Sequence, residues 1–450
     1  MKRISFFFFL LLFSSSSLLA GIGDEGWNGL FNGKDLSGWK QLNGEASYKV
    51  INGEIVGTTV ANTPNSFLTT EKTYSDFVLE LELLVDGHMN SGIQFRSESK
   101  SDYMNGRVHG YQCEVDPSER AWSGGIYDEA CRGWLYPCTL NPEGGKAFKN
   151  GAWNKYLIEC IGNNIRTWLN GVPVAHLIDD MTPEGFICLQ VHGIEKDVEP
   201  GSQVRWRNIR IKTENLEPAP SEDIFVVNLL PNNLSEAEKK QGWKLLFDGK
   251  TSAGWKSVKS EKFPDKGWEI EDGALSVISN EGDSGNNGGD IHTREKFSAF
   301  DLQFEFNLTE GANSGIKYFT LDDKPSLGLE YQILDDGHHP DAKQGAAGNR
   351  KLASLYDLIP SEKNGRFVKK TGDWNRGRIV VHPDGKVEHW LNGIKVVEYQ
   401  KDSNIFHALV ARSKYAEVEG FASSKEFRIL IQDHNDNVHF RSIKIKNLNQ

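Results

Sequence analysis

The chain has 450 residues, more than one ordinary domain holds, which favours two domains. Its formal net charge of −11 at pH 7, without a visible basic patch, argues against nucleic acid as a partner. A hydrophobic content of 38%, with 11% aromatic residues, is sufficient for ordinary cores. Glycine is abundant, at 45 residues, and helical periodicity is scarce, which predicts strands joined by many turns.

The first 20 residues have the pattern of a secretory signal peptide. Lys2 and Arg3 precede an apolar run at 4–13, and a serine-rich stretch then leads to Ala20. The apolar run is too short for a comfortable transmembrane span, and no cysteine follows the expected cleavage site, which disfavours a lipoprotein. We therefore expect a periplasmic or secreted protein with no transmembrane segment in its mature chain.

After this segment, one outline of short motifs occurs twice, about two hundred residues apart. This spacing is far longer than that of solenoid repeats, so the sequence predicts two copies of one domain, at 24–214 and 241–450, with a linker at 215–240. The matched motifs are Leu30–Gly33 with Leu246–Gly249, Asn90–Ile93 with Asn313–Ile316, Gly151–Asn154 with Gly372–Asn375, Trp168–Gly171 with Trp390–Gly393, Leu189–His192 with Ile431–His434, and Trp206–Ile209 with Phe440–Ile443.

Both copies are predicted to be all-β. Alternating strands are expected at 48–56, 77–85, 92–97, 110–116, 154–161, 164–169, 172–177, 185–192 and 204–213, and then at 268–278, 300–308, 315–320, 328–334, 376–381, 387–391, 394–399, 427–433 and 438–446. The Asn–Gly pairs at 170–171 and 392–393 indicate type I′ turns, which need positive φ at both positions. In the linker, Ser235 could cap a single helical turn. The spacing predicts a sandwich or jelly roll.

One strand and its following loop, at 110–134, concentrate the polar chemistry of the first copy. Side chains two apart on a strand share a face, so Gln112, Glu114 and Asp116 form one polar row. Pro117 should end the strand. Planar polar groups beside flat aromatic rings are suited to a sugar-binding groove. The loop supplies such groups in Glu119, Arg120, Trp122, Tyr127, Asp128, Glu129, Arg132 and Trp134.

The five cysteines all lie in the first copy. Cys113, Cys160 and Cys188 fall in apolar strand patterns and are expected to be small core residues. Cys131 and Cys138 share one loop and could pair in an exported protein. No cysteine has the spacing of a structural zinc site.

The order of these motifs, seen twice, resembles the 3-keto-disaccharide hydrolase domain family. The resemblance rests on L-F-(N/D)-G, G-W, N-S-G-I, W-N, W-L-N-G, L-Q-x-H and R-N-I, and covers nearly the whole mature chain. It implies two tandem concanavalin A-like jelly rolls, each made of two antiparallel sheets. It also implies action on glycosides whose C3 hydroxyl has been oxidised to a ketone, usually by exported proteins of carbohydrate-degrading bacteria.

Cleavage of such a glycoside needs a base near C2, a group that polarises the ketone and an acid near the leaving oxygen. Glu114 is the first candidate for the base and His192 the second, with Gln190 on the same strand face as His192. Tyr127, Arg96 and Arg120 are candidates to stabilise the enolate oxygen, and Asp116 could orient Arg120. Further substrate-binding candidates are Gln112, Trp122, Glu129, Arg132, Trp134 and Trp153.

The pattern requires no cofactor, although Glu114, Asp116 and His192 could share a divalent cation. The second copy departs from the first, because Glu and Gln exchange places at Glu330 and Gln332 and the arginine and tryptophan of the loop are missing. We therefore expect the first copy to be catalytic. The candidates in the second copy are Glu330, Gln332, Asp335, Tyr356 and His434.

Two other functions fit the same residues. Glu114, Asp116 and Glu119 match the E-x-D-x-x-E pattern of laminarinase-like retaining glucanases, which need two carboxylates about 5–5.5 Å apart. Alternatively, both copies could only bind carbohydrate, with tandem sites raising the avidity for a polymer. In each case the expected partner is an oligosaccharide or glycoside, and the sequence does not determine the oligomeric state.

Overall fold

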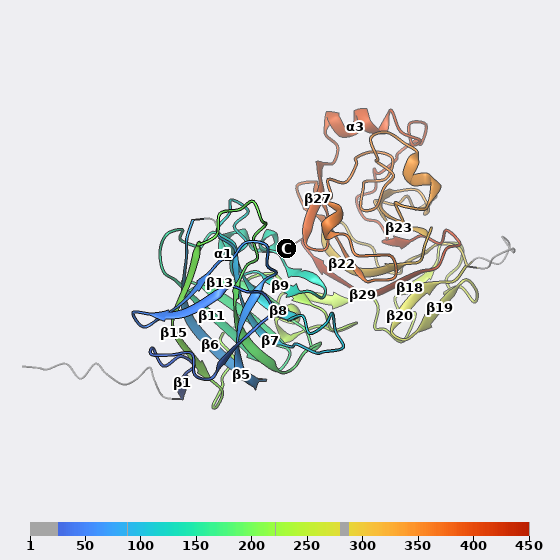
Figure 1. The fold of residues 1–450 in the computed structure, drawn as a ribbon. Coiled ribbons are helices and arrows are strands. Elements are labelled where there is room, and N and C mark those ends of the chain that lie inside the picture. Colours follow the sequence, from blue (N-terminus) through green and yellow to red (C-terminus); the bar gives the residue numbers. More distant parts are fainter. Residues whose placement is uncertain (1–25, 88, 221, 280–287, 450) are drawn as a thin grey trace, which may run out of the picture.

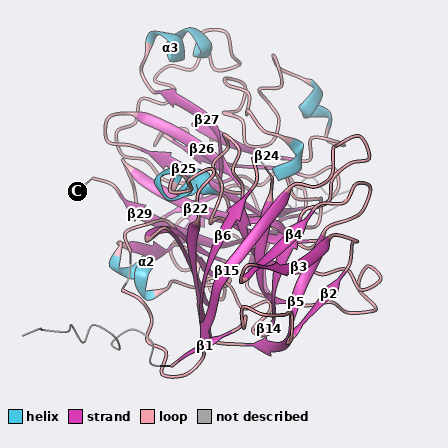
Figure 2. Cartoon of the chain, turned by 60° about the vertical axis from the view of Figure 1, so that its left-hand side comes forward, coloured by secondary structure: helices cyan, strands magenta, loops and turns pink. Residues whose placement is uncertain are grey.

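A computed structural model describes residues 26–449, apart from 88, 221 and 280–287. The predicted signal peptide at 1–20 lies outside the described residues. The chain forms two β-sandwiches side by side, the first coloured blue to green and the second yellow to red (Figure 1). Strands dominate both, and the helices are short (Figure 2). The all-β prediction is confirmed, and none of the described helices is long and apolar enough to cross a membrane.

The first sandwich packs a larger sheet against a smaller one. In the larger sheet the order is β16-β13-β12-β11-β6-β15-β4-β3, with β1 beside β15, and in the smaller it is β10-β9-β8-β7-β14-β5-β2. The larger sheet contains β1 (Trp27–Gly29), β3 (Ser47–Ile51), β4 (Glu54–Thr58), β6 (Phe77–Val85), β11 (Asn154–Ile161), β12 (Asn164–Leu169), β13 (Val172–Ile178), β15 (Gln203–Lys212) and β16 (Val226–Asn228). The smaller sheet contains β2 (Trp39–Leu42), β5 (Ser66–Tyr74), β7 (Ser91–Ser97), β8 (Gly110–Val115), β9 (Ile126–Glu129), β10 (Gly133–Tyr136) and β14 (Gly185–Val191), and η1 (Cys138–Leu140) and α1 (Pro142–Gly145) follow β10.

The second sandwich repeats this plan with a reduced smaller sheet. The strand orders are β19-β20-β29-β22-β25-β26-β27, with β17 beside β29, and β18-β21-β28-β23-β24. The larger sheet contains β17 (Trp243–Leu245), β19 (Trp268–Glu271), β20 (Ala274–Val277), β22 (Phe300–Leu308), β25 (Asn375–Val381), β26 (Lys386–Leu391), β27 (Ile394–Gln400) and β29 (Val438–Asn447). The smaller sheet contains β18 (Trp255–Ser257), β21 (Ile291–Thr293), β23 (Asn313–Tyr318), β24 (Leu329–Leu334) and β28 (Leu430–Ile431), and the loops carry η2 (Pro340–Lys343), η3 (Gly365–Phe367) and α3 (Asn404–Val410).

Alternation along each strand separates the core from the outer faces. In β6, Phe77, Leu79 and Leu81 are buried, whereas Glu80 and Glu82 are half-buried on the other face. Residues two apart on a strand point the same way, so this pattern presses one face of β6 onto the facing sheet. The equivalent strand β22 is buried on both faces over most of its length, because the first domain and the linker cover its outer side.

The turns and the helix cap that the sequence indicated formed as predicted. Asn170 and Gly171 have φ of 52° and 83°, and Asn392 and Gly393 have φ of 51° and 84°, as a type I′ turn requires. In the linker, Ser235 caps α2 (Glu236–Lys240) through a complete capping box with Glu238. The linker is more ordered than expected, since its strand β16 adds in parallel to β13 of the first sandwich.

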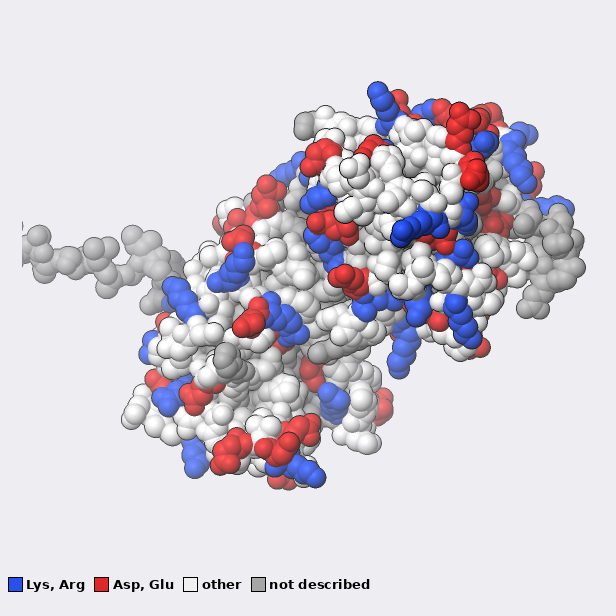
Figure 3. All heavy atoms as spheres, turned by 90° about the horizontal axis from the view of Figure 1, so that it is seen from above, with Lys and Arg blue, Asp and Glu red and all other residues white. Residues whose placement is uncertain are grey.

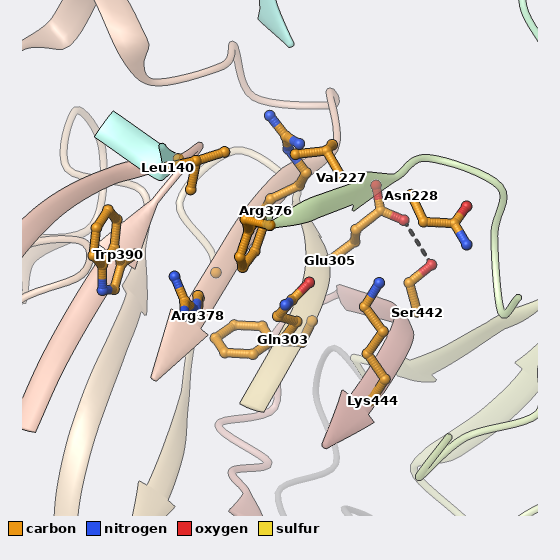
Figure 4. Close-up of a pocket in the computed structure, with 14 residues that line it drawn as sticks. Leu140, Val227, Asn228, Gln303, Glu305, Arg376, Arg378, Trp390, Ser442 and Lys444 are labelled. Atoms are coloured by element: carbon orange, nitrogen blue, oxygen red, sulfur yellow. Dashed lines mark hydrogen bonds between the residues drawn. The ribbon is translucent and has the colours of Figure 1, made fainter. Parts of the chain in front are cut away.

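The linker strand also forms part of the contact between the two sandwiches. Figure 4 shows Val227 and Asn228 of β16 facing second-domain strands that carry Glu305, Arg376 and Ser442. These residues line a cavity of about 50 Å³. Within this seam, Ser442 Oγ donates to Glu305 Oε2 over 2.9 Å. Part of the outer face of the second domain's larger sheet, around Glu305 and Arg376, is therefore covered by the first domain and the linker.

All five cysteines are unpaired, so the pairing left open for Cys131 and Cys138 does not form. Cys131 is exposed in the turn between β9 and β10. Cys138 lies beyond β10 and is buried in the first core, where its Sγ contacts Ser123 O at 3.8 Å. The intervening strand β10 separates the two thiols.

Candidate active site

The polar row of β8 lies on the sheet face opposite the core. Tyr111, Cys113 and Val115 point into the sandwich, so Gln112 and Glu114 occupy the other face. Gly92 is the register partner of Glu114 on β7, and a Cβ there would come within 2.3 Å of Gln112. The absence of a side chain at Gly92 lets Gln112 lie flat across β7 toward β14.

Four amide side chains, from three neighbouring strands and a turn, form a hydrogen-bonded network with Glu114. Two of them donate to its carboxylate and two donate to Gln112. Asn90 Nδ2 donates to Glu114 Oε1 over 2.6 Å, and Gln112 Nε2 donates to Oε2 over 3.1 Å. Gln112 Oε1 in turn accepts from Gln94 Nε2 at 3.2 Å and Gln190 Nε2 at 3.0 Å. Gln190 therefore meets the β8 row, as expected for strands that share one face. Its own Oε1 is buried without a hydrogen-bond partner in the described part of the chain.

Burial gives Glu114 the character of a base. The side chain is only 4% exposed, and this desolvation raises the pKa of Glu114 from 4.5 to about 7, against the lowering effect of the Asn90 and Gln112 hydrogen bonds. Arg120 lowers the same pKa and Asp116 raises it, both by smaller amounts. A carboxyl group with a pKa near neutrality can accept a proton and release it again at physiological pH.

Arg120 lies near Glu114. Its Nε contacts Asp116 Oδ2 at 2.7 Å, and its guanidinium lies 4.4 Å above the ring of Trp122 and 5.2 Å from that of Trp134. Burial alone would raise the pKa of Asp116, but hydrogen bonds from Ser118 and Arg120 lower it overall. Asp116 thus orients Arg120, one of the two arrangements expected for it. Arg120 is therefore a cation held near Glu114 against the rings of Trp122 and Trp134, which we call the aromatic wall.

The strands β9 and β10 continue this wall. Tyr127 is the register partner of Gln112, and its ring lies 5.2 Å from Trp134, which in turn meets Trp122 edge-on at 4.6 Å. Glu129 pairs with Arg107 at 2.9 Å. Arg132 binds Asp128 and Asp179 at 2.5 and 2.6 Å, so its charge is already neutralised by two carboxylates.

Two predicted site residues, Arg96 and Trp153, lie elsewhere. Arg96 is corrected to a structural role, because its guanidinium donates to Ser75 O and Gly162 O and pairs with Asp76, away from the β8 row. The backbone at Arg96 has φ of 45°, which interrupts the alternation used to place it on the polar face. Trp153 stacks under Arg207 at 4.0 Å, and Trp374 stacks under Arg441 at the same distance, so both pairs are structural.

His192 also differs from expectation. The strand β14 ends at Val191, and His192 is exposed with its Nδ1 2.7 Å from Gly193 O. It takes no part in the amide network around Glu114. Glu119 is exposed in the loop beyond Pro117, so it does not join the row either. The structure therefore leaves Glu114 as the carboxylate at the centre of the site.

Metal-ligating side chains converge in the second domain rather than in the first. Among the described residues, His339, His434 and Asp436 place their ligand atoms within 4.8 Å of one another. The combination predicted for a cation, Glu114, Asp116 and His192, does not form such a group there, because Asp116 is held by Arg120 and His192 points outward.

The second domain carries a related cavity of about 280 Å³ on the equivalent sheet face. Gln332 faces Gly315 and Glu330 faces Lys317 in the register of β23 and β24. Lys414 lies 4.2 Å above the Tyr356 ring, and the Tyr356 hydroxyl donates to Asp341 at 2.8 Å. Glu330, Gln332, Tyr356 and His434 line this cavity.

Asp335 is corrected to a turn residue. It accepts the backbone N–H groups of Gly311 and Gly337 and pairs with His338 at 2.8 Å. Asn90, for which the sequence indicated no functional role, is a further residue of the first-domain site, since it donates to Glu114. The signal was its place just before β7, the strand that pairs with β8.

A β-sandwich with a buried carboxylate, amides, an arginine and tryptophans on one sheet face is typical of carbohydrate-active proteins. The family model described as "3-keto-alpha-glucoside-1,2-lyase-like domain" matches residues 26–212 and again 242–446. The chain belongs to this family and contains its domain twice, which confirms the resemblance seen in the sequence.

One curated relative and two solved structures are similar to parts of the chain. A "3-keto-disaccharide hydrolase" of Bacteroides thetaiotaomicron is 35% identical over 231 residues, covering 46% of this chain and 78% of the relative. A crystallised candidate glycosyl hydrolase of Parabacteroides distasonis is 30% identical, with a TM-score of 0.43, and covers 49% of this chain and 100% of its own. A carbohydrate-binding module of Bacillus subtilis is 17% identical, with a TM-score of 0.29, and the match covers 39% of this chain and 95% of the module.

Proposed function

We propose that the first domain cleaves glycosides of 3-keto sugars, with Glu114 as the base that removes the C2 proton. The observation that carries the proposal is the position of Glu114: it is buried, held by two amide donors and has a pKa raised to about 7 by its burial. The family membership supports a keto-glycoside as the substrate class.

The reaction follows from the acidity that a C3 ketone confers on the C2–H bond. Ionised Glu114 takes the C2 proton, and the electron pair forms the enolate of the C3 ketone. The enolate then expels the glycosidic oxygen from C1, and this oxygen leaves as an alcohol after it gains a proton. Addition of water to the resulting enone gives net hydrolysis, whereas release of the enone gives elimination.

The charge that develops on the C3 oxygen needs a positive neighbour. Arg120 provides one, since it lies close enough to Glu114 to lower its pKa and is fixed by Asp116 and the tryptophan rings. A cation that is already oriented next to the developing charge stabilises an enolate with little reorganisation. The unpartnered Gln190 Oε1 adds an acceptor suited to a sugar hydroxyl.

The proposal is tested with a 3-keto-disaccharide and a β-1,3-glucan as substrates. We expect the intact protein to release product from the keto sugar alone, and Glu114→Gln to abolish release. Glu119→Gln is the matched control, because Glu119 is exposed outside the row, and it should retain activity. Release from the glucan that requires both carboxylates would instead establish the laminarinase-like alternative.

The second domain supports a subordinate role in carbohydrate binding. Its cavity of about 280 Å³ combines Tyr356 and Lys414 with the amides of Gln332 and Gln432. We expect it to bind saccharide without cleaving it. Glu330→Gln should leave turnover of the keto sugar unchanged, and an equal loss of turnover in this variant would contradict the division of labour.

Export belongs to the same proposal. A keto-glycoside hydrolase with the N-terminal pattern Lys2–Ala20 is expected in the periplasm or the medium. N-terminal sequencing of the protein recovered from the periplasmic fraction should begin close after Ala20. Recovery of a chain that still carries Met1 from the cytoplasm would contradict export.

A further inference from the structure

The two domains enclose a cavity of about 640 Å³ at the end of the aromatic wall. The first domain contributes Tyr127 and Trp134, and the second contributes Lys369 and Trp374. A smaller cavity of about 70 Å³ shares Tyr127, Trp134 and Lys369 and adds Phe367. The segment 367–369 of the second domain therefore reaches the wall that begins beside Glu114.

This segment is held in place by the contact between the domains. Asn392 of the type I′ turn donates from Nδ2 to Phe367 O over 2.7 Å, and the next residue, Gly393, accepts from Thr139 Oγ1 of the first domain over 2.6 Å. Arg376 donates to Leu135 O over 2.8 Å. The Phe367 ring also lies 5.8 Å from Trp122. The segment is thus positioned by the same turn that the first domain contacts.

Lys369 brings hydrogen-bond donors into the cavity. Its Nζ donates to Arg132 O, which uses one of its three N–H groups, and no carboxylate of the described residues lies at ion-pair distance from it. Burial lowers the pKa of Lys369 to about 8, with Arg376 and Arg132 adding to the effect. Polar hydrogens in a partly buried position are stabilised when a ligand accepts from them.

Two of the arginines that line the cavity are already paired with carboxylates. Arg132 is neutralised by Asp128 and Asp179, and Arg441 by Glu305 at 2.8 Å. Lys369, Lys370 and Arg376 also line the cavity without an ion-pair partner among the described residues, and Lys369 lies beside the rings of Tyr127, Trp134 and Trp374. Flat apolar rings with a few polar donors match the faces and hydroxyls of a sugar.

The cavity is also at the right place for the second ring of a substrate. Tyr127 pairs with Gln112, whose amide contacts Glu114. The strand β10, which carries Trp134, is two strands from β8, or about 10 Å at the usual spacing. A saccharide whose keto ring sits over Glu114 can therefore extend its leaving ring toward β10 and the second domain.

We propose that the inter-domain cavity is the subsite for the leaving sugar of the keto-glycoside, and that Phe367 and Lys369 of the second domain complete it. This inference rests on the proposed function, and it assigns the second domain a direct part in the first domain's substrate specificity. The two copies then form one composite site as well as two separate faces.

The test compares two substrates of the full-length protein, a 3-keto-disaccharide and the methyl 3-keto-glucoside that lacks a leaving sugar. Lys369→Met and Phe367→Ala should each lower kcat/KM for the disaccharide about tenfold, because remote binding energy is used in the transition state. The methyl glycoside should change less than about twofold. Phe367→Tyr should retain activity on the disaccharide, and Lys250→Met, at an exposed lysine far from the site, is the matched control.

Equal losses on both substrates, or no loss on either, would overturn the subsite. If the intact protein cleaves neither substrate, the proposed function fails separately. The subsite is then decided by calorimetric binding of the unoxidised disaccharide to the intact protein and to Lys369→Met. Weaker binding by the variant supports the subsite, and unchanged binding refutes it.

Discussion

The two sandwiches carry the same pair of residue types, one Gln and one Glu, in opposite order on the equivalent strands β8 and β24. In the first domain Gln112 lies over Gly92, and the carboxylate of Glu114 follows two residues later. In the second domain the carboxylate itself lies over the glycine, since a Cβ at Gly315 would come within 2.3 Å of Glu330 Oε1. The same glycine notch therefore receives an amide in one copy and a carboxylate in the other.

This exchange changes the neighbours of each carboxylate. Glu114 receives only neutral amide donors directly, and burial raises its pKa to about 7. Glu330 has a cation nearby, with Lys317 Nζ at 3.7 Å. The carboxylate of Glu330 therefore has a cation as a neighbour, whereas that of Glu114 has amides. The comparison teaches that a shift of two residues along the strand changes the partners of the carboxylate, and this difference is why we propose the base only in the first copy.

The largest expected effect comes from removing that base. Glu114→Gln should lower kcat/KM for a 3-keto-disaccharide by about a thousandfold, the scale of a lost general base. Glu330→Gln should change it less than about twofold, because Glu330 is not expected to contact the reacting sugar. Steady-state kinetics on both variants, with circular dichroism to verify folding, measure the difference. Similar losses in the two variants would remove the functional distinction between the copies.

A smaller effect is expected from the cation next to the base. Arg120→Met should lower kcat/KM by about ten- to a hundredfold, because the enolate loses its positive neighbour. In the intact protein kcat/KM should rise with pH and level off above about pH 7, as Glu114 becomes ionised. Arg120 favours the ionised form, so its removal should move this midpoint to higher pH.

Arg120→Lys is the control for charge. It keeps the cation but loses the planar contact with the tryptophans. Its midpoint should stay near that of the intact protein even if its maximal rate falls. A pH profile that is flat between pH 5 and 9 in the intact protein would show that Glu114 is not the titrating base.

The free energy of unfolding should also depend on Glu114, but in the opposite direction from activity: ionisation of Glu114 raises activity and lowers stability. The folded state raises the pKa of Glu114 to about 7, so between pH 4.5 and 7 it binds more protons than the unfolded chain and loses stability as pH rises. Glu114→Gln removes this penalty. We expect it to stabilise the protein by on the order of 1–3 kcal/mol at pH 8 and hardly at all at pH 4.

Urea unfolding at the two pH values measures this effect. Glu119→Gln, at an exposed position, should show no such pH dependence. Equal stabilisation of Glu114→Gln at pH 4 and pH 8 would indicate that packing, rather than the buried charge, differs between the side chains.

The smallest effect concerns the first domain's thiols. In the native protein Cys131 is the exposed cysteine, whereas Cys113, Cys138, Cys160 and Cys188 are buried. A thiol reagent should modify one site rapidly and the remaining four only after denaturation. Cys131→Ser should remove the rapid phase and leave activity unchanged, and failure to detect five thiols in the denatured chain would contradict the unpaired state.

Local patterns in the sequence were sufficient for much of the architecture. The repeat, the strands over 77–85, 154–161 and 300–308, the Asn–Gly turns and the Ser235 cap depend on residues close together in the chain, and each formed as predicted. The alternation that joined Gln112 with Glu114 is equally local, and the structure brings Gln190 to the same row.

Other features were decided only by tertiary structure. A left-handed backbone at Arg96 turned its side chain away, and the early end of β14 left His192 exposed. Asn90 reaches Glu114 across neighbouring strands, and Phe367 reaches Trp122 from another domain. The alternation of polar and apolar residues along a strand predicts which face of the sheet each side chain occupies. Contacts between residues far apart in the chain depend on sheet pairing and domain packing, which a single sequence does not specify.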